Sequence, residues 1–398
     1  MPSLSEETNG RIERLMPGAT IGIIGGGQLG RMFAQAAATM GYHVAVLEPG
    51  KACPAGEVSR EQIETKYDDV AGLAALAGRV KAVTTEFENV PAPSLEYLEK
   101  AGLRVCPPSA AVAVTQDRNV EKHFVSEVAG VPVAPHAAVR SEADVDALDA
   151  SLLPGILKTA RLGYDGKGQA RVATIEDVRK AFRDFGGVDC VLEKRLSLKL
   201  EVSVIVARNS HGETATFPVS ENFHRNGILA VSVLPARIDE DTASRARGYA
   251  AKIAQALNYV GVLCVELFIL EDGTILVNEL APRPHNSGHA TIDACVTSQY
   301  EQQVRTMAGL PLGSTEQHSH AVMLNILGDE WFDEEGVKRE PDWAGVTAIP
   351  GAKLHIYGKA DARRARKMGH VTCIGRTAEE AMERAREAAR ILHLPEPN

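Results

Sequence analysis

The chain has 398 residues, which is too long for one ordinary hydrophobic core and predicts two or three domains. Hydrophobic residues make up 44% and charged residues 24%, as in soluble globular proteins, while a formal net charge of −9 argues against a broad nucleic-acid-binding face. Six scattered cysteines without a CxxC pair disfavour a zinc site or a disulfide framework. We therefore expect a cytoplasmic protein with small-molecule partners, no nucleic acid and no membrane.

The order of elements predicts three folded parts. Strand and helix signals alternate first, which indicates a small doubly wound parallel sheet. A helix and antiparallel hairpins follow, as in an α+β domain, and short strands then lead to an amphipathic helix that begins near Ala378. We expect a flexible leader at 1–19, an N-terminal Rossmann-like domain at 20–115, a middle domain at 116–310 and a small β-rich C-terminal domain at 311–398.

A glycine turn, GGGQLGR, joins the first expected strand to the first helix at residues 25–31. Gly25, Gly27 and Gly30 have the GxGxxG spacing of a dinucleotide-binding unit. Glu48 at the end of the second strand suits the same interpretation. An NAD-dependent dehydrogenase is therefore one hypothesis for the function.

A second glycine-rich loop, GYDGKGQ, lies between two strand-like segments at residues 163–169. Glycines let backbone amides approach a polyphosphate, and Lys158 and Lys167 could neutralise its charge. The loop is not a P-loop, because glycine follows the lysine. It is either a phosphate-binding flap or an ordinary hairpin.

Two carboxylates are predicted to face each other on a later hairpin. The segment EDGT favours a two-residue turn, and counting outward from a Glu271–Thr274 pair places Glu266 opposite Glu279. Facing carboxylates destabilise an antiparallel pair unless a cation lies between them. Oxygen ligands beside a triphosphate suit Mg²⁺, so both are candidate metal ligands. A slipped register or two solvent-facing side chains are the alternatives.

The segment LAPRPHNSGH directly follows Glu279. Arg283, His285, Asn286 and His289 lie there in a stretch stiffened by two prolines. This polar density beside a metal and nucleotide site suits a small anionic substrate.

Several motifs together resemble one family. GGGQLGR, TTEFENV, TQDRNVEKHF, GYDGKGQ, NELAPRPHNSGH and RKMGH occur in family order within residues 25–370. They are similar to those of the 5-(carboxyamino)imidazole ribonucleotide synthases, members of the ATP-grasp superfamily. The family commonly has RPGRKMGH, whereas Arg364 and Ala365 replace the Pro-Gly here. This departure leaves the geometry of the loop open.

The resemblance implies an ATP-grasp fold with an N-terminal preATP-grasp domain, and ATP in the middle domain under a lid at about 120–200. It implies Mg²⁺ on Glu266 and Glu279, and a homodimer. The ATP-binding residues that it implies are Arg118, Lys158, Gly163, Tyr164, Asp165, Gly166, Lys167, Gly168, Gln169, Glu193, Lys194, Arg195, Leu196, Glu201, His224, Asn278 and Glu279.

The implied reaction is the ATP- and bicarbonate-dependent carboxylation of 5-aminoimidazole ribonucleotide through carboxyphosphate, in purine biosynthesis. The catalytic candidates are Tyr164, Asp165, Lys167, Arg283 and His285. The candidate substrate-binding residues are Gln28, Leu29, Glu86, Glu88, Asn286, Lys359 and Arg366. A formate-dependent glycinamide ribonucleotide transformylase is the alternative within the superfamily, although Gln28 and Arg31 differ from its GELGK-type first turn. A non-catalytic regulatory protein that keeps the nucleotide fold is another.

Overall fold

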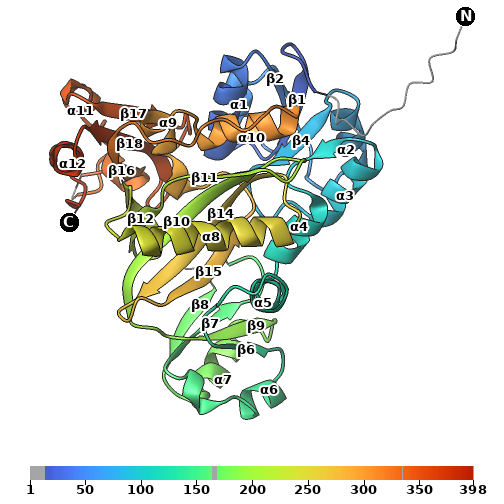
Figure 1. Cartoon of the computed structure of the whole chain (residues 1–398), viewed down its shortest axis with the longest axis vertical. Helices are drawn as coiled ribbons and strands as arrows, with labels where there is room; N and C mark the ends of the chain where they lie inside the picture. The colour runs from blue at the N-terminus through green and yellow to red at the C-terminus, as the bar shows by residue number, and fades with distance from the viewer. Residues whose placement is uncertain (1–13, 164–167, 334, 398) are drawn as a thin grey trace, which may run out of the picture.

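A computed structural model describes residues 14–163, 168–333 and 335–397. Figure 1 shows an N-terminal part (blue to cyan) and a C-terminal part (red) at the upper two sides of a central sheet, with a smaller green lobe below it. The chain is a mixed α/β protein, as the sequence predicts.

The N-terminal part is a five-stranded parallel sheet in the order β3-β2-β1-β4-β5. This order is that of a doubly wound fold and confirms the expected Rossmann-like sheet. Its elements are β1 (Thr20–Ile24), α1 (Gln28–Thr39), β2 (His43–Leu47), η1 (Gly56–Val58), β3 (Glu61–Ile63), α2 (Val70–Ala77), β4 (Ala82–Thr85), α3 (Ala92–Lys100), β5 (Arg104–Val105) and α4 (Ser109–Thr115).

The expected leader is anchored where the structure describes it, at residues 14–19. The Leu15 amide donates to the Ala308 carbonyl at 2.9 Å, and the Tyr42 hydroxyl donates to the Leu15 carbonyl at 2.8 Å. This stretch is therefore not loose, contrary to the expectation. The rest of the expected leader, residues 1–13, lies outside the described residues.

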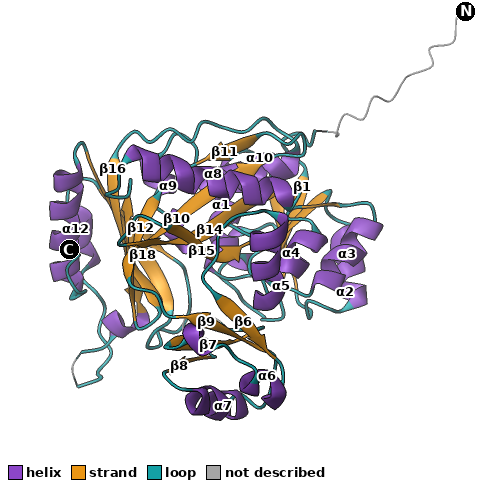
Figure 2. Cartoon of the chain, turned by 60° about the horizontal axis from the view of Figure 1, so that its bottom comes forward, coloured by secondary structure: helices purple, strands orange, loops and turns teal. Residues whose placement is uncertain are grey.

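The lower lobe is a four-stranded antiparallel sheet in the order β6-β9-β7-β8. Helices α6 and α7 pack on it and lie at its outer side in Figure 2. Helix α5 contacts both β9 of this lobe and β15 of the central sheet, so it bridges the two. The elements are α5 (Arg118–His123), the π-helical turn η2 (Phe124–Val128), β6 (His136–Val139), α6 (Glu142–Asp146), η3 (Ala150–Leu152), β7 (Gly155–Thr159), β8 (Gln169–Val172), α7 (Ile175–Asp184) and β9 (Cys190–Lys194).

The central sheet has nine strands, in the order β15-β14-β10-β12-β13-β16-β18-β17 with β11 beside β10. Helix α8 packs on β10 and β14 through Ala246, Ala250 and Ile253, which are fully buried. The elements are β10 (Leu198–Arg208), β11 (Thr214–Thr216), β12 (Ser220–Arg225), β13 (Ile228–Leu234), α8 (Glu240–Ala256), β14 (Gly261–Leu270), β15 (Ile275–Ala281), η4 (Asn286–Gly288), α9 (Thr291–Ala294) and α10 (Gln299–Ala308).

The last three strands continue this sheet across the expected boundary at residue 311. Strand β16 pairs with β13 along four residue pairs, from Val231–Leu324 to Leu234–Ala321. The expected C-terminal helix forms as α12 and packs on β16 and β18. The elements are β16 (His320–Leu327), η5 (Gly328–Trp331), α11 (Trp343–Ala348), β17 (Ala352–Ile356), β18 (Lys367–Gly375) and α12 (Ala378–Leu392). The middle and C-terminal parts thus share one sheet.

All six cysteines are buried and carry free thiols. Among the described residues, none of the helices is long and apolar enough to cross a membrane.

Candidate active site

The glycine turn at the start of α1 is filled by two carboxylates of the same domain. Gly26 donates its amide hydrogen to Glu48 at 2.9 Å, Leu29 donates to Glu86 at 3.0 Å, and Gly27 also donates to Glu86. A Cβ atom at Gly27 would lie 2.4 Å from a Glu86 oxygen, so glycine is needed for this close approach. The helix-start amides that would bind a dinucleotide pyrophosphate are already occupied.

Glu86 is the deepest of these groups, with 8% of its surface exposed. Burial raises its pKa, and hydrogen bonds from Gly27, Gly30 and Leu29 oppose this rise. From the sequence, Glu86 and Leu29 are expected to bind the substrate. In the structure Glu86 accepts the amide hydrogen of Leu29, so these two residues bind each other. Gln28, the other candidate at this turn, takes no part in that contact.

Glu266 and Glu279 face each other on β14 and β15, as counting along the hairpin predicts. The turn, however, differs from the expected one. Leu270 donates its amide hydrogen to the Thr274 carbonyl at 2.9 Å, so the loop contains three residues instead of two. The assumed Glu271–Thr274 pair is therefore wrong.

A β-bulge at Asn278 restores the alignment of the two carboxylates. Leu267 pairs with Val277, whereas the next pair is Glu266 with Glu279, so Asn278 has no partner across the strands. If the strands paired regularly, without the bulge, Asn278 would lie opposite Glu266 and Glu279 would lie on the other face of the sheet. The loop is one residue longer than expected, and the bulge places one extra residue in β15. These two differences cancel, so Glu266 still pairs with Glu279. The sequence shows neither of them.

Both carboxylates contact a cationic or polar side chain. Arg118 Nη1 lies 2.7 Å from Glu279 Oε2, and His285 Nε2 lies 3.1 Å from Glu266 Oε1. Burial raises the pKa of Glu279, but the charges of Arg118 and Lys158 lower it to about 2. Glu279 is therefore ionised at neutral pH. The Asn278 Oδ1 atom beside it is buried and has no hydrogen-bond partner in the part of the chain that the structure describes. These oxygen atoms fit a divalent cation of the Mg²⁺ type.

A buried cluster joins the lower lobe to the central sheet. Lys158 and Lys122 lie 3.1 and 3.2 Å from the two Glu193 oxygens, and Lys122 also donates to the Asn278 carbonyl at 3.3 Å. Burial raises the pKa of Glu193, but the two lysines lower it. The resemblance places Glu193 at the adenine, whereas its side chain here balances two cations.

Sequence reasoning missed Glu121 and Lys122. Glu121 accepts the Leu280 amide hydrogen at 3.2 Å, and burial together with Glu279 raises its pKa to about 8. Both residues are at least 95% buried. The signal was present in the sequence, because Arg118, Glu121 and Lys122 occupy one helical face at i, i+3 and i+4.

The expected nucleotide pocket is partly assembled along the sheet and the lower lobe. His224 Nδ1 lies 2.9 Å from Glu201, where burial lowers the pKa of His224 but Glu201 raises it. The Lys194 and Arg195 amides donate to the carbonyls of Pro135 and Pro154, and so are not free for adenine. Leu196 follows in the same segment and is partly exposed.

The second glycine-rich loop joins β7 to β8, which pair in an antiparallel manner as expected. Tyr164, Asp165, Gly166 and Lys167 lie outside the described residues. At the two ends of this stretch, the Gly163 carbonyl lies 3.5 Å from Arg118, and the Gly168 carbonyl accepts the Thr159 amide hydrogen at 2.9 Å. Gln169 begins β8 and is exposed.

Two candidates from the loop after β15, the catalytic candidate Arg283 and the substrate candidate Asn286, differ in their contacts. Arg283 pairs with Glu88 at 2.8 Å, and this contact opposes the rise in the Glu88 pKa that burial causes. Asn286 is 7% exposed, and neither of its side-chain polar atoms has a partner among the described residues. An unsatisfied buried amide is expected where a ligand binds.

A stack of three histidines joins η4 to β17 and β18. The His289 and His370 ring centroids lie 4.7 Å apart, and those of His370 and His355 lie 4.4 Å apart. Tyr300 and Tyr357 place their hydroxyls 3.2 and 2.9 Å from His289 and His370. His289 is fully buried and therefore serves the contact between domains.

The expected phosphate-binding cations lie on the loop between β17 and β18. Lys359 Nζ donates to the Lys367 carbonyl at 2.6 Å, and Arg366 donates to the Asp361 carbonyl at 2.8 Å. Ala365 has φ +61°, the left-handed conformation that favours glycine, and it stands where the RPGRKMGH motif of the resemblance has glycine. Asp329 accepts the Ala365 amide hydrogen at 2.6 Å and holds this conformation.

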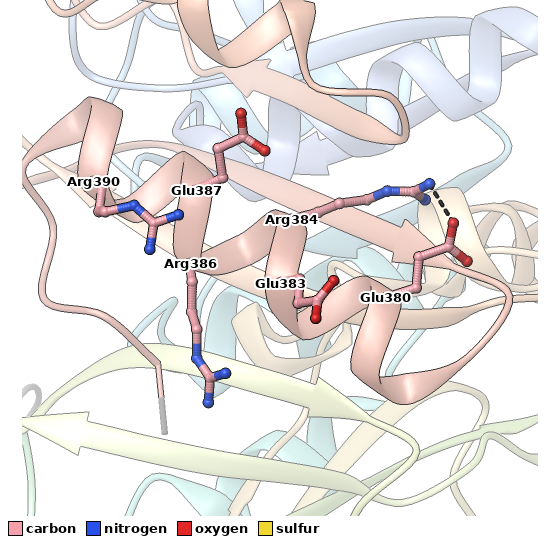
Figure 3. A pocket seen from close by; sticks show the side chains of 6 residues that line it. All are labelled: Glu380, Glu383, Arg384, Arg386, Glu387 and Arg390. Atoms are coloured by element: carbon pink, nitrogen blue, oxygen red, sulfur yellow. Dashed lines mark hydrogen bonds and ion pairs between the residues drawn. The ribbon is translucent and has the colours of Figure 1, made fainter.

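A surface hollow of about 520 Å³ lies elsewhere, on α12 (Figure 3). Six charged side chains of this one helix line it, and Arg384 pairs with Glu380 at 2.5 Å. Such a mixed-charge face is typical of a solvated helix, so this hollow is not the candidate active site.

Comparisons with known protein families match three domain models to the chain. An ATP-grasp domain matches residues 124–300, a ribonucleotide synthetase preATP-grasp domain matches 18–116, and a phosphoribosylaminoimidazole carboxylase C-terminal domain matches 321–384. The fold and site therefore define an enzyme of the ATP-grasp superfamily.

Relatives identify the family within this superfamily. The N5-carboxyaminoimidazole ribonucleotide synthase of Brucella melitensis biotype 1 is 48% identical over 363 residues, 90% of this chain and 97% of the relative. That of Bacillus subtilis is 43% identical over 367 residues, 92% and 94% of the two chains. The chain belongs to the N5-carboxyaminoimidazole ribonucleotide synthase family. The resemblance drawn from the motifs is confirmed, and the chain is an ATP-dependent ligase.

Solved structures of this family have the same fold. An ADP complex of an N5-carboxyaminoimidazole ribonucleotide synthetase has a TM-score of 0.87 at 44% identity, and the match covers 96% of this chain and 98% of that one. The Aspergillus clavatus enzyme in complex with ADP and 5-aminoimidazole ribonucleotide has a TM-score of 0.85 at 28% identity, and the match covers 95% and 100%. The expected ATP-grasp fold, with its preceding and C-terminal domains, is thus confirmed.

Proposed function

We propose that the chain uses ATP and bicarbonate to carboxylate the exocyclic amine of 5-aminoimidazole ribonucleotide in purine biosynthesis. The observation that carries this proposal is the charged site on the central sheet. Glu266 and Glu279 face each other there, Arg118 and Lys158 supply positive charge, and Arg283 lies on the loop that follows. Relatives that are similar over 90% and 92% of the chain bear the name of this reaction's product.

The nucleotide would lie between the lower lobe and the central sheet. Arg118 and Lys158 would contact its phosphates, the loop from Gly163 to Gln169 would cover them, and the Glu201–His224 pair would face its ribose. Glu193, Lys194, Arg195 and Leu196 would surround the adenine, and Asn278 would complete the pocket. Glu266 and Glu279 would hold Mg²⁺, which would neutralise charge on the transferring phosphoryl group.

The chemistry would start with attack of bicarbonate on the γ-phosphorus, which gives carboxyphosphate and ADP. The amine of the aminoimidazole then takes up the carboxyl group, with release of phosphate. Arg283 and His285 would hold the anionic oxygens near Glu88 and Glu266, while burial of the site excludes water from a labile acyl phosphate. Tyr164, Asp165 and Lys167 are the candidates for orienting the substrate and moving its proton.

The ribonucleotide would bind between the first glycine turn and the β17–β18 loop. Gln28, Leu29, Glu86 and Glu88 would form one wall, and Asn286 would offer its amide, which has no partner among residues 14–163, 168–333 and 335–397. Lys359 and Arg366 would bind the phosphate, as two cations suited to a dianion. We keep the domain limits 20–115, 116–310 and 311–398, a cytoplasmic location and a homodimer as further parts of this proposal.

An ADP-release assay with paired substrates tests the reaction. We expect release with bicarbonate plus 5-aminoimidazole ribonucleotide and only background with formate plus glycinamide ribonucleotide. Turnover with the second pair alone would mean that the chain is a transformylase.

A further inference from the structure

Three consecutive residues after β17 lie against the N-terminal domain. Tyr357 is 1% exposed and belongs to the hydrophobic cluster that contains Met32 and Phe33 of α1. Gly358 follows with φ +71°, and Lys359 Nζ lies 5.7 Å from the centroid of the Tyr357 ring. The start of the β17–β18 loop is therefore held by the N-terminal domain, although its sequence belongs to the C-terminal part.

Gly358 lies directly on an ion pair of the N-terminal domain. Arg31 Nη1 is 2.9 Å from Glu57 Oε2, and it also donates to the Pro54 carbonyl at 3.0 Å. A Cβ atom at Gly358 would lie 2.9 Å from both Arg31 Nη1 and Glu57 Oε2, so a side chain at this position would have to displace the pair. The Arg31–Glu57 pair thus forms the surface on which the loop turns.

Arg31 also belongs to the segment that contains the first glycine turn. It is the fourth residue of α1 and follows Gln28 by three positions, so the two side chains lie on the same face of the helix. Gln28 belongs to one wall of the proposed ribonucleotide site, and Lys359, directly after Gly358, belongs to the other. Arg31 therefore lies where the two walls meet.

We propose that Arg31 and Glu57 are positioning residues that hold the Gly358 turn, and through it Lys359, at the distance from α1 that the substrate phosphate needs. The proposal rests on the proposed function, in which Lys359 binds the phosphate of the ribonucleotide. A lysine side chain is long and flexible, and it binds a phosphate as a point charge. Its contribution to binding therefore depends on a fixed backbone beneath it.

The N-terminal domain offers a matched control in the Arg79–Glu61 pair. Arg79 Nε lies 3.0 Å from Glu61 Oε2, and Arg79 Nη1 donates to the Ala75 carbonyl at 2.6 Å. Like Arg31, this arginine bonds one carboxylate and one carbonyl group of its own domain. Glu61 lies on β3, at the edge of the parallel sheet. Arg79→Ala therefore shows what the loss of such a pair does by itself.

Steady-state ADP release at varied ribonucleotide concentration is the first measurement. We expect Arg31→Ala and Glu57→Ala to raise the KM for 5-aminoimidazole ribonucleotide about 10-fold, with the KM for ATP unchanged, and Arg79→Ala to behave like the wild type. With the riboside, which lacks the phosphate, neither variant should raise the KM. An equal rise for ribonucleotide and riboside would show a general structural effect and overturn the proposal. An unchanged KM for the ribonucleotide would overturn it too.

The sign of the Glu57→Ala effect separates this role from direct binding. If Arg31 bound the phosphate itself, the loss of its carboxylate partner would free the cation, and the KM for the ribonucleotide would fall. A lower KM in Glu57→Ala would therefore overturn the proposal. The Glu57 side chain is 52% exposed, so we expect this variant to fold, and it carries the comparison if Arg31→Ala does not.

Titration calorimetry with ribose 5-phosphate gives a second measurement that needs no turnover. We expect Arg31→Ala and Glu57→Ala to bind it about 10-fold more weakly than the wild type and Arg79→Ala do. Equal binding by these proteins, or binding by none of them, would overturn the proposal. If binding changes as expected but no substrate pair gives ADP, the proposed function fails and the positioning role remains.

Discussion

At the level of single residues, the glycine turn shows how one side chain changes the meaning of a motif. Glu86 takes the amide hydrogens of Gly27 and Leu29, so the helix start that could bind a dinucleotide is occupied by the protein itself. Glu48 does the same for Gly26. The GxGxxG spacing indicates that some group lies close to the backbone of the turn. In this protein that group is a carboxylate.

Glu279→Gln tests the metal assignment. The amide is isosteric and can still accept a hydrogen bond from Arg118, so we expect the fold to remain while most Mg²⁺-dependent ADP release is lost. Glu271→Gln at the exposed hairpin turn is the control and should behave like the wild type. Undiminished turnover of Glu279→Gln over a Mg²⁺ titration would refute the assignment.

Ala365→Gly tests the left-handed position in the β17–β18 loop. A non-glycine residue with positive φ lowers the free energy of unfolding by about 1–2 kcal/mol. Replacing it by glycine recovers only part of this amount, because glycine has the greater chain entropy in the unfolded state. We expect a gain of up to about 1 kcal/mol in the free energy of unfolding, measured in urea. Ala360→Gly lies in the same loop without positive φ and should be destabilising. Loss of stability in both variants would refute the interpretation.

At the level of elements, the hairpin of β14 and β15 marks how far the sequence could predict the site. The facing of Glu266 and Glu279 was predicted, but through a two-residue turn that does not form. Turn length and bulge are set by packing of both strand faces, which a local pattern does not contain. The same holds for Glu193, whose role depends on lysines from two other elements. The order of strands and helices, in contrast, follows from local periodicity and was predicted well.

The histidine stack makes stability depend on pH. Burial lowers the pKa of His289 and His370 well below the ordinary value of about 6.5, and neighbouring histidines lower it further. Above pH 6.5 both residues are neutral in the folded and unfolded states, so stability does not change through them. Below this pH the unfolded state binds more protons than the folded state. Each of the two histidines then lowers the free energy of unfolding by up to about 1.4 kcal/mol per pH unit.

Urea unfolding from pH 7.5 to 5.5 checks this effect. The free energy of unfolding of the wild type should fall below about pH 6.5. In His370→Gln this fall should be smaller by about the contribution of one histidine. The difference between the two proteins isolates the histidine from carboxylates that titrate in the same range. Parallel curves for the two proteins would contradict a neutral, buried His370.

At the level of the whole molecule, the Gln303 side chain forms hydrogen bonds with both the N-terminal domain and the central sheet. Gln303 on α10 accepts the Val262 amide hydrogen at 2.7 Å and donates to Thr84 and the Cys106 carbonyl at 3.1 and 3.0 Å. It is 1% exposed, so none of these bonds can be replaced by water without rearrangement. The docking of the two sheets therefore depends on this amide.

Gln303→Leu should lower the free energy of unfolding by about 2–3 kcal/mol, because buried polar groups lose their partners. Denaturation in urea, followed by circular dichroism, measures the loss. Gln255→Leu, on the exposed face of α8, is the control and should change stability little. A loss below about 0.5 kcal/mol for Gln303→Leu would show that the other contacts between the domains, such as the Arg283–Glu88 pair and the apolar packing, hold them together without this amide.

The continuity of the central sheet has a consequence for substrate choice. Strand β14 carries Glu266, and the loop after β17 carries Lys359, with an unbroken series of paired strands between them. The proposed metal site on β14 and the proposed phosphate-binding loop after β17 are thus separated by a fixed number of strand widths, whatever the lower lobe does. If the substrate reacts beside Glu266 while its phosphate binds Lys359, the site would select its substrate by length. An analogue with one more methylene between ribose and phosphate could then satisfy one end or the other, and closure of the lobe could not correct the misfit.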